Sequence, residues 1–161
     1  MLASVIILGA AAFFAVALTR SRPLSEDGAA RRDAALGLAL ATSVQAVHFV
    51  EEAATGFHER FPVLFGLPPI PFPVFLSFNL AWLAIWAASV LGLRSGRAGA
   101  LFAAWFLAIA GGLNGIGHPL LAVVAGGYFP GLLSSPFMGV AAGLLWVRLR
   151  RATRPERTQA G

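Results

Sequence analysis

The sequence contains no cysteine and no lysine, and charged residues occupy only 12% of its 161 positions. Without cysteine there is no disulfide, no thiolate metal ligand and no thiol nucleophile. An ordinary soluble domain is about 25% charged and about 45–50% apolar, whereas this chain is 58% hydrophobic. A single core of this size cannot bury so much apolar surface. We therefore expect an integral membrane protein.

All twelve basic residues are arginines, and their positions predict a topology rather than a nucleic-acid partner. Cytoplasmic loops of membrane proteins are enriched in Lys and Arg. Eleven of the arginines fall on one side of the expected spans and only Arg60 on the other, so we expect the N-terminus outside and the C-terminus in the cytoplasm. The eleven are Arg20, Arg22, Arg31, Arg32, Arg94, Arg97, Arg148, Arg150, Arg151, Arg154 and Arg157.

Five apolar segments are long enough for a transmembrane helix, which needs about 20 mostly apolar residues, and the fourth is longer than the rest. They cover residues 2–19, 34–56, 74–93, 99–125 and 131–147. The predicted fold is an all-α integral membrane bundle of five helices over residues 1–147, followed by a basic cytoplasmic tail at 148–161. The abundance of alanine, glycine and arginine is typical of a GC-rich genome, and we expect the bacterial inner membrane.

The first segment has a second interpretation, because Ala15-Val16-Ala17 is similar to the cleavage site of a signal peptide. No basic residue precedes the apolar run, and Arg20 and Arg22 follow it directly. This charge distribution favours an uncleaved anchor with its N-terminus outside.

Residues 48–52, His-Phe-Val-Glu-Glu, place three ionisable side chains in the outer half of the second span. At 100° per residue, His48, Glu51 and Glu52 fall within one arc of a helix. A charged residue at mid-membrane costs roughly 2.5–3.5 kcal/mol on the mildest scale. Two adjacent glutamates at this depth therefore indicate a functional site.

This pentapeptide resembles the signature of the HXXEE family, small multi-span membrane proteins named for the motif. The resemblance covers five residues together with the hydropathy pattern of the chain. It implies a multi-span membrane protein and carries over His48, Glu51 and Glu52, without implying an activity.

Other polar residues occur at a similar depth in the third and fourth spans. Asn79 lies near the outer end of the third, and Asn114 and His118 lie one turn apart in the outer half of the fourth. At about 1.5 Å of rise per residue, these positions share one layer of the bilayer with the HXXEE residues. We therefore expect His48 and His118 to meet at a common point.

The fourth span also carries signals for close packing and for a local break. Gly111 and Gly115 have the small-xxx-small spacing that lets two helix backbones approach closely. Pro119 lacks an amide hydrogen and its ring clashes with the carbonyl of Gly115, so a kink or a short unwinding is expected near His118.

The first functional hypothesis is an enzyme with a metal site for a lipid-like substrate. Imidazole and carboxylate ligands suit zinc or iron, and we expect His48, Glu52 and His118 to be the ligands. A ferritin-like di-iron centre is disfavoured, because it needs about four glutamates. Glu51 would then transfer protons or support a ligand.

Two alternatives stay open. One is metal-free acid–base catalysis of the isomerase or cyclase type, with His48, Glu51 and Glu52 as catalytic groups. The other is a non-enzymatic small transporter or ligand-binding membrane protein. In the enzymatic hypotheses the substrate-binding side chains are expected to be Asn79, Asn114 and Trp82, and the partner a membrane lipid or another apolar molecule.

Overall fold

A computed structural model describes residues 2–153, with side chains from residue 6 onward. This part of the chain is helical, which confirms the all-α class. Its helices are α1 (Leu2–Ser21), α2 (Gly28–Ala54), α3 (Phe57–Val63), α4 (Phe72–Arg94), α5 (Ala98–Val124) and α6 (Ser135–Ala152).

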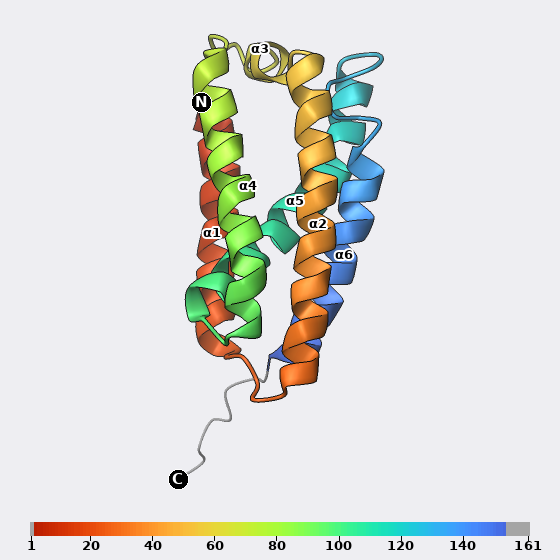
Figure 1. Ribbon diagram of the computed structural model, residues 1–161. Helices are drawn as coiled ribbons and strands as arrows, with labels where there is room; N and C mark the ends of the chain where they lie inside the picture. The colour runs from red at the N-terminus through yellow and green to blue at the C-terminus, as the bar shows by residue number, and fades with distance from the viewer. Residues whose placement is uncertain (1, 154–161) are drawn as a thin grey trace.

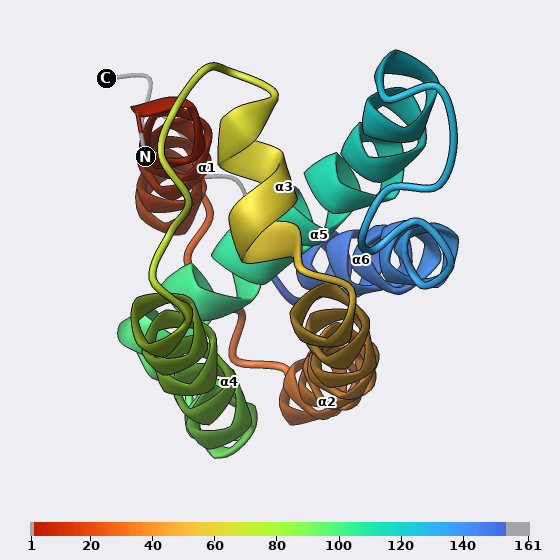
Figure 2. The same ribbon diagram turned by 90° about the horizontal axis from the view of Figure 1, so that it is seen from above.

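The five long helices run alternately up and down, and the short helix α3 lies across one end of the bundle (Figure 1). Seen from that end, α5 crosses the centre and the other long helices surround it (Figure 2). α5 packs against α1, α4 and α6, while α2 packs against α4 and α6. The arrangement brings α2 and α5 together beneath α3.

The helix α2 begins at Gly28, six residues before the expected start of the second span. Asp27 provides the reason, because its Oδ1 accepts hydrogen bonds from the amides of Ala29 (2.8 Å) and Ala30 (3.3 Å). A carboxylate at this position satisfies amide groups that have no partner inside the helix. The first loop is therefore shorter than the sequence suggested.

The helix α6 continues to Ala152, five residues beyond the expected end of the fifth span at residue 147, so the first part of the expected basic tail is helical. Arg148 lies on this helix with its Nε 3.4 Å from Oδ1 of Asp33, and the amide of Ser25 donates to the carbonyl of Ala152 (2.9 Å). These contacts with the loop before α2 and with its first turns stabilise the end of α6. Residues 154–161 lie outside the described part of the chain.

Of the kink or short unwinding expected near His118, the unwinding is wrong, because α5 is unbroken from Ala98 to Val124 with Pro119 inside it. Proline removes only one backbone hydrogen bond, and helices in membranes tolerate this loss when neighbouring elements pack on both sides. His118 on one side of Pro119 is buried, and the preceding turns pack against α6.

The close contact between α5 and α6 depends on glycines, as the small-xxx-small spacing predicted. A Cβ at Gly111 would collide with the side chains of Met138 and Ala142, and one at Gly115 would lie 2.6 Å from Cα of Gly139. Because backbone lies opposite Gly115, the two helices would have to separate to admit a methyl group.

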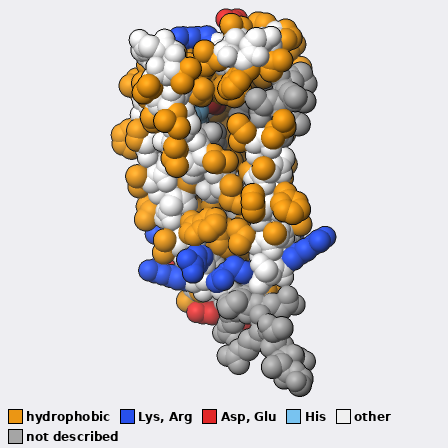
Figure 3. Space-filling view, turned by 180° about the vertical axis from the view of Figure 1, so that it is seen from behind, with side chains coloured by type: hydrophobic (Ala, Val, Ile, Leu, Met, Phe, Trp, Pro, Cys, Tyr) orange, Lys and Arg blue, Asp and Glu red, His pale blue; other side chains and the backbone are white. Residues whose placement is uncertain are grey.

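Three helices, α2, α4 and α5, are long and apolar enough to cross a membrane. Hydrophobic side chains cover much of the face shown in Figure 3, and arginine side chains gather at one end of the molecule. The exposed apolar surface and this charge distribution both fit a membrane protein.

We expect Gly115→Ala to lower the free energy of unfolding by about 1–3 kcal/mol, because it forces two backbones apart. Gly112→Ala is the matched control, since a Cβ at Gly112 meets nothing within 4 Å. Thermal unfolding of the protein purified in detergent would compare the two variants. Equal unfolding midpoints would contradict the close approach of α5 and α6.

Candidate metal centre

Three ionisable side chains meet near the end of the bundle that α3 covers. His48 and Glu52 lie one turn apart on α2, and His118 comes from α5. Nε2 of His48 is 3.5 Å from Oε1 of Glu52, and Nε2 of His118 is 3.3 Å from the same oxygen. The imidazole rings are nearly perpendicular, with centroids 4.7 Å apart. The predicted meeting of His48 and His118 is confirmed, and we call these three residues the triad.

The hydrogen bond at the far side of the His118 ring fixes its tautomer. Nδ1 of His118 lies 2.6 Å from the carbonyl oxygen of Pro130. A carbonyl oxygen can only accept, so Nδ1 carries the hydrogen and donates it. In the neutral ring, Nε2 is then the atom with the free lone pair, and it is the atom that faces Glu52.

The same reasoning applies to His48 through one additional group. The hydroxyl of Ser134 donates its hydrogen to Oε2 of Glu51. The Ser134 oxygen must therefore accept in its 2.8 Å contact with Nδ1 of His48. The neutral His48 ring thus also presents the lone pair of Nε2 to Glu52, and this buried nitrogen has no hydrogen-bond partner among the described residues.

With both imidazoles neutral, the triad brings together three atoms that accept and none that donates. Its members are 0% (His48), 5% (Glu52) and 3% (His118) exposed, so water does not screen the carboxylate charge. A buried carboxylate is strongly unfavourable unless a cation compensates it. Within residues 2–153, the ion-pair contacts of Glu52 are with these two imidazoles. Either an additional proton or a metal ion must therefore occupy the space between the three atoms.

The geometry fits a metal ion. One nitrogen or oxygen from each triad residue lies within 4.8 Å of the other two. Ligand atoms at about 2.0–2.1 Å from a tetrahedral Zn²⁺ are about 3.3–3.4 Å apart, which matches the separations of 3.3 and 3.5 Å between Nε2 and Oε1. Two histidines and one glutamate are also a ligand set that catalytic zinc uses.

The surroundings of the triad are apolar and tightly packed. The ring of Phe57 lies 5.4 Å from that of His118, and Phe129 lies 6.4 Å from it. Gly131 adopts a left-handed φ of 86° and contacts both imidazoles. Water is therefore excluded from most of the space around the three ligand atoms, which strengthens their electrostatic interaction with a cation.

Glu51, expected among the catalytic groups, does not join the triad. Its carboxylate points to the loop before α6, where it accepts hydrogen bonds from the amides of Leu133 (3.0 Å) and Ser134 (2.8 Å). It also accepts from the hydroxyls of Ser134 and of Tyr128, the latter at 2.8 Å. Burial raises the pKa of the Tyr128 phenol, and so does its bond to Glu51, so this hydroxyl stays protonated and donates at neutral pH.

The expected substrate-binding residues lie outside the triad. The side-chain amide of Asn79 donates to the carbonyl of Phe75 in its own helix (2.9 Å), and Trp82 packs on Phe106 with centroids 4.5 Å apart. Within residues 2–153, no hydrogen bond joins Asn79 or Asn114 to the triad. Asn79 and Asn114 were expected at the depth of the triad, but their side chains form no hydrogen bond with it in the described chain.

The sequence reasoning missed the loop before α6. Pro130 and Ser134 support the two histidines, and Gly131 lies beside Cε1 of both imidazoles. These residues are far from His48 in the sequence, and a serine or a glycine in a loop carries no pattern that indicates such a contact. Gly131 and Ser134 were expected within the fifth span, 131–147, whereas α6 begins only at Ser135. The local signal for a longer loop was limited to the glycines and the proline just before that span.

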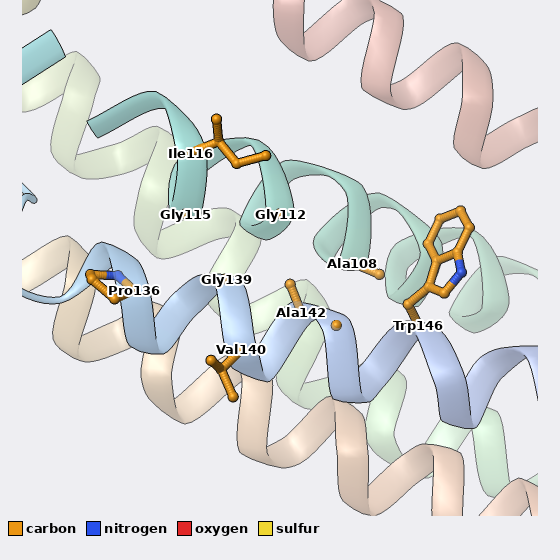
Figure 4. A pocket seen from close by; sticks show the side chains of 10 residues that line it. Ala108, Gly112, Gly115, Ile116, Pro136, Gly139, Val140, Ala142 and Trp146 are labelled. Atoms are coloured by element: carbon orange, nitrogen blue, oxygen red, sulfur yellow. The ribbon is translucent and has the colours of Figure 1, made fainter. Parts of the chain in front are cut away.

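Two apolar grooves lie on the surface away from the triad. One, of about 470 Å³, runs between α5 and α6 from Ile116 and Pro136 to Trp146 (Figure 4). The other, of about 430 Å³, lies between α1, α5 and α6 and shares Trp146 with the first. Neither is lined by the triad or by the predicted substrate-binding residues.

Comparison with known proteins gives no match to a family model, to a curated protein or to a solved structure. The resemblance of residues 48–52 to the HXXEE signature therefore stays an expectation. The function has to be argued from the side chains of this chain alone.

We expect Gly131→Ala to destabilise the protein more than Gly126→Ala. Both glycines have a left-handed φ, which costs an alanine about 1–2 kcal/mol. Only at Gly131 does a Cβ also approach ring atoms, at 2.5 Å from Cε1 of His118 and 2.9 Å from Cε1 of His48, whereas Gly126 has open space. Thermal unfolding in detergent measures the difference. Equal losses of stability in the two variants would show that Gly131 does not lie against the imidazoles.

Proposed function

We propose that this protein is a membrane-embedded metalloenzyme that uses one zinc ion, held by His48, Glu52 and His118, to act on a lipid-like substrate. The observation that carries the proposal is the orientation of the two imidazoles. Each donates from Nδ1 to a fixed acceptor and turns the lone pair of Nε2 towards the buried carboxylate of Glu52. Metal-binding histidines in proteins are usually oriented in this way.

The ligand set leaves a position for chemistry. Three protein ligands leave a fourth site on zinc for water or substrate, and zinc lowers the pKa of bound water to about 7. Iron in two-histidine, one-carboxylate sites also keeps open positions. The packing of Phe57, Phe129 and Gly131 around the triad favours zinc, which needs only one further ligand.

The surroundings support a lipid-like substrate. Aromatic rings pack against the triad, and the two surface grooves on α5 and α6 are lined by apolar side chains. In Figure 3, histidine and acidic side chains are visible in a hollow near the end opposite the arginines. An apolar molecule dissolved in the bilayer meets this apolar surface directly, whereas a polar solute would first have to leave water.

We also propose that all five long helices span the inner membrane of a bacterium, with the triad towards the outer face. The arginine side chains of the described residues gather at the end away from α3 (Figure 3), with Arg60 at the α3 end. The positive-inside rule places the arginine-rich end in the cytoplasm. The N-terminal end of α1 and the loop before α6 would then face outside.

The metal site is tested by elemental analysis of the detergent-purified protein, prepared without chelators and supplied with zinc. We expect about one zinc ion per chain for the wild type. Glu52→Gln and His118→Ala should lose it, because each removes one of three ligands. Glu59→Gln is the matched control, since Glu59 is exposed on α3 and lies outside the triad.

Lipids that co-purify, identified by mass spectrometry, are then offered to the zinc-loaded wild type and to Glu52→Gln.

A wild-type protein without stoichiometric zinc or iron would contradict the metal site. Glu52 and the imidazoles would then share a proton, and metal-free acid–base chemistry would be the better hypothesis. If the Glu52→Gln variant still converts a lipid, the activity lies elsewhere in the protein.

The topology is tested with reporter fusions in a bacterial host. Fusions after Arg97 and after Arg157 should both report the cytoplasm, and a fusion after Gly127 should report the outside, because the arginines fix the orientation. An external signal after Arg97 would overturn the five-span arrangement.

A further inference from the structure

Glu51, although it lies outside the triad, is connected to it by a directional chain of hydrogen bonds. An ionised carboxylate can only accept, so the hydroxyl of Ser134 gives its single hydrogen to Glu51. The Ser134 oxygen is then left to accept from Nδ1 of His48, at 2.8 Å. The charge of Glu51 therefore determines which nitrogen of His48 carries the hydrogen.

The position of Glu51 is determined by more than this one bond. Two backbone amides and the hydroxyl of Tyr128 also donate to its carboxylate, and the amides belong to Leu133 and Ser134, directly before the first residue of α6. Backbone amides at a helix N-terminus favour a negative charge. Glu51 is therefore well suited to remain ionised and stationary, and poorly suited to bind the metal itself.

The same loop orients the second imidazole. The carbonyl of Pro130 accepts from Nδ1 of His118, and Gly131 lies so close to both rings that a Cβ there would be within 3 Å of each. A second tie lies at the start of the loop, where the guanidinium of Arg60 donates to the carbonyl of Tyr128 (3.2 Å) and lies over the ring of Phe129 (5.6 Å). Residues 128–134, fastened by Glu51 and Arg60, thus support both imidazoles of the triad.

We propose that Glu51 and residues 128–134 form a positioning unit, here called the outer clasp, that sets the metal affinity of the triad by holding both histidines in the metal-binding tautomer. This inference rests on the proposed metal site. In it Ser134 and Glu51 are positioning residues, because they act through His48 and do not touch the metal or the substrate.

The outer clasp also affects the strength of the His48 ligand. When Nδ1 of an imidazole donates to an acceptor that is itself bonded to a carboxylate, as Ser134 is to Glu51, Nε2 becomes more basic. Loss of such a partner typically lowers metal affinity 10–100-fold. A clasp that only capped α6 would change the stability of the protein and leave the affinity of a folded site unchanged. The two roles can therefore be separated by experiment.

The decisive variant is Ser134→Ala in the full-length protein. It removes the link to His48 and leaves the amide and Tyr128 bonds of Glu51 in place. Competition with a chromophoric zinc chelator measures the affinity in detergent. We expect Ser134→Ala to bind zinc about 10–100-fold more weakly than the wild type, and Ser134→Thr, which keeps a hydroxyl, to restore most of the affinity.

Two further variants complete the test. Glu51→Gln removes the charge behind Ser134 and should weaken zinc binding in the same direction. Ser43→Ala is the matched control, because the exposed hydroxyl of Ser43 on α2 donates to the carbonyl of Ala39 in the same helix (3.1 Å), and its affinity should equal that of the wild type. Thermal unfolding of each metal-free variant, with chelator present, shows whether the fold itself has changed.

The outcomes separate this inference from the proposed function. A wild type that binds no zinc overturns the metal site itself. A wild type that binds zinc, with Ser134→Ala of equal affinity, overturns the outer clasp alone. The same conclusion follows if Ser134→Ala loses affinity only together with metal-free stability and Ser134→Thr restores neither. Weaker binding by Ser134→Ala at unchanged metal-free stability, with rescue by Ser134→Thr, supports the clasp.

Discussion

The structure around the triad depends on one constraint, the burial of the Glu52 carboxylate. With only 5% of this residue exposed, the charge cannot be left without a partner. Its ion-pair contacts in the described chain are with two imidazoles, one a turn below it and the other on α5. The requirement for positive charge at this point accounts for a polar cluster within a largely apolar bundle, and it is the physical basis for proposing a metal.

Adjacent glutamates take different roles because a helix turns 100° per residue. Glu52 faces the interior between α2 and α5, whereas Glu51 faces the loop before α6. The first carboxylate lacks donors and needs a cation, while the second is saturated by four hydrogen bonds. One sequence motif therefore supplies both a candidate ligand and the group that positions the surrounding loop.

Small residues allow the elements to come close enough for these contacts. Gly115 and Gly139 let the backbones of α5 and α6 meet, and Gly131 lets the loop lie against both imidazoles. In a membrane, where apolar side chains gain little by leaving lipid, close packing and internal hydrogen bonds hold helices together. The tight packing of α5 on α6 also places the loop that joins them over the triad.

The sequence by itself determined the all-α class, the approximate positions of the long helices and the pairing of His48 with Glu52 and His118. These follow from local properties, namely hydropathy, helical period and depth along a helix. Only the tertiary structure decided that Glu51 faces away from the triad, that Asn79 and Asn114 do not reach it, and that Pro130 and Ser134 do. Depth along a helix fixes a height but not a direction around the helix axis, and the path of a loop depends on packing between distant segments that no local pattern records.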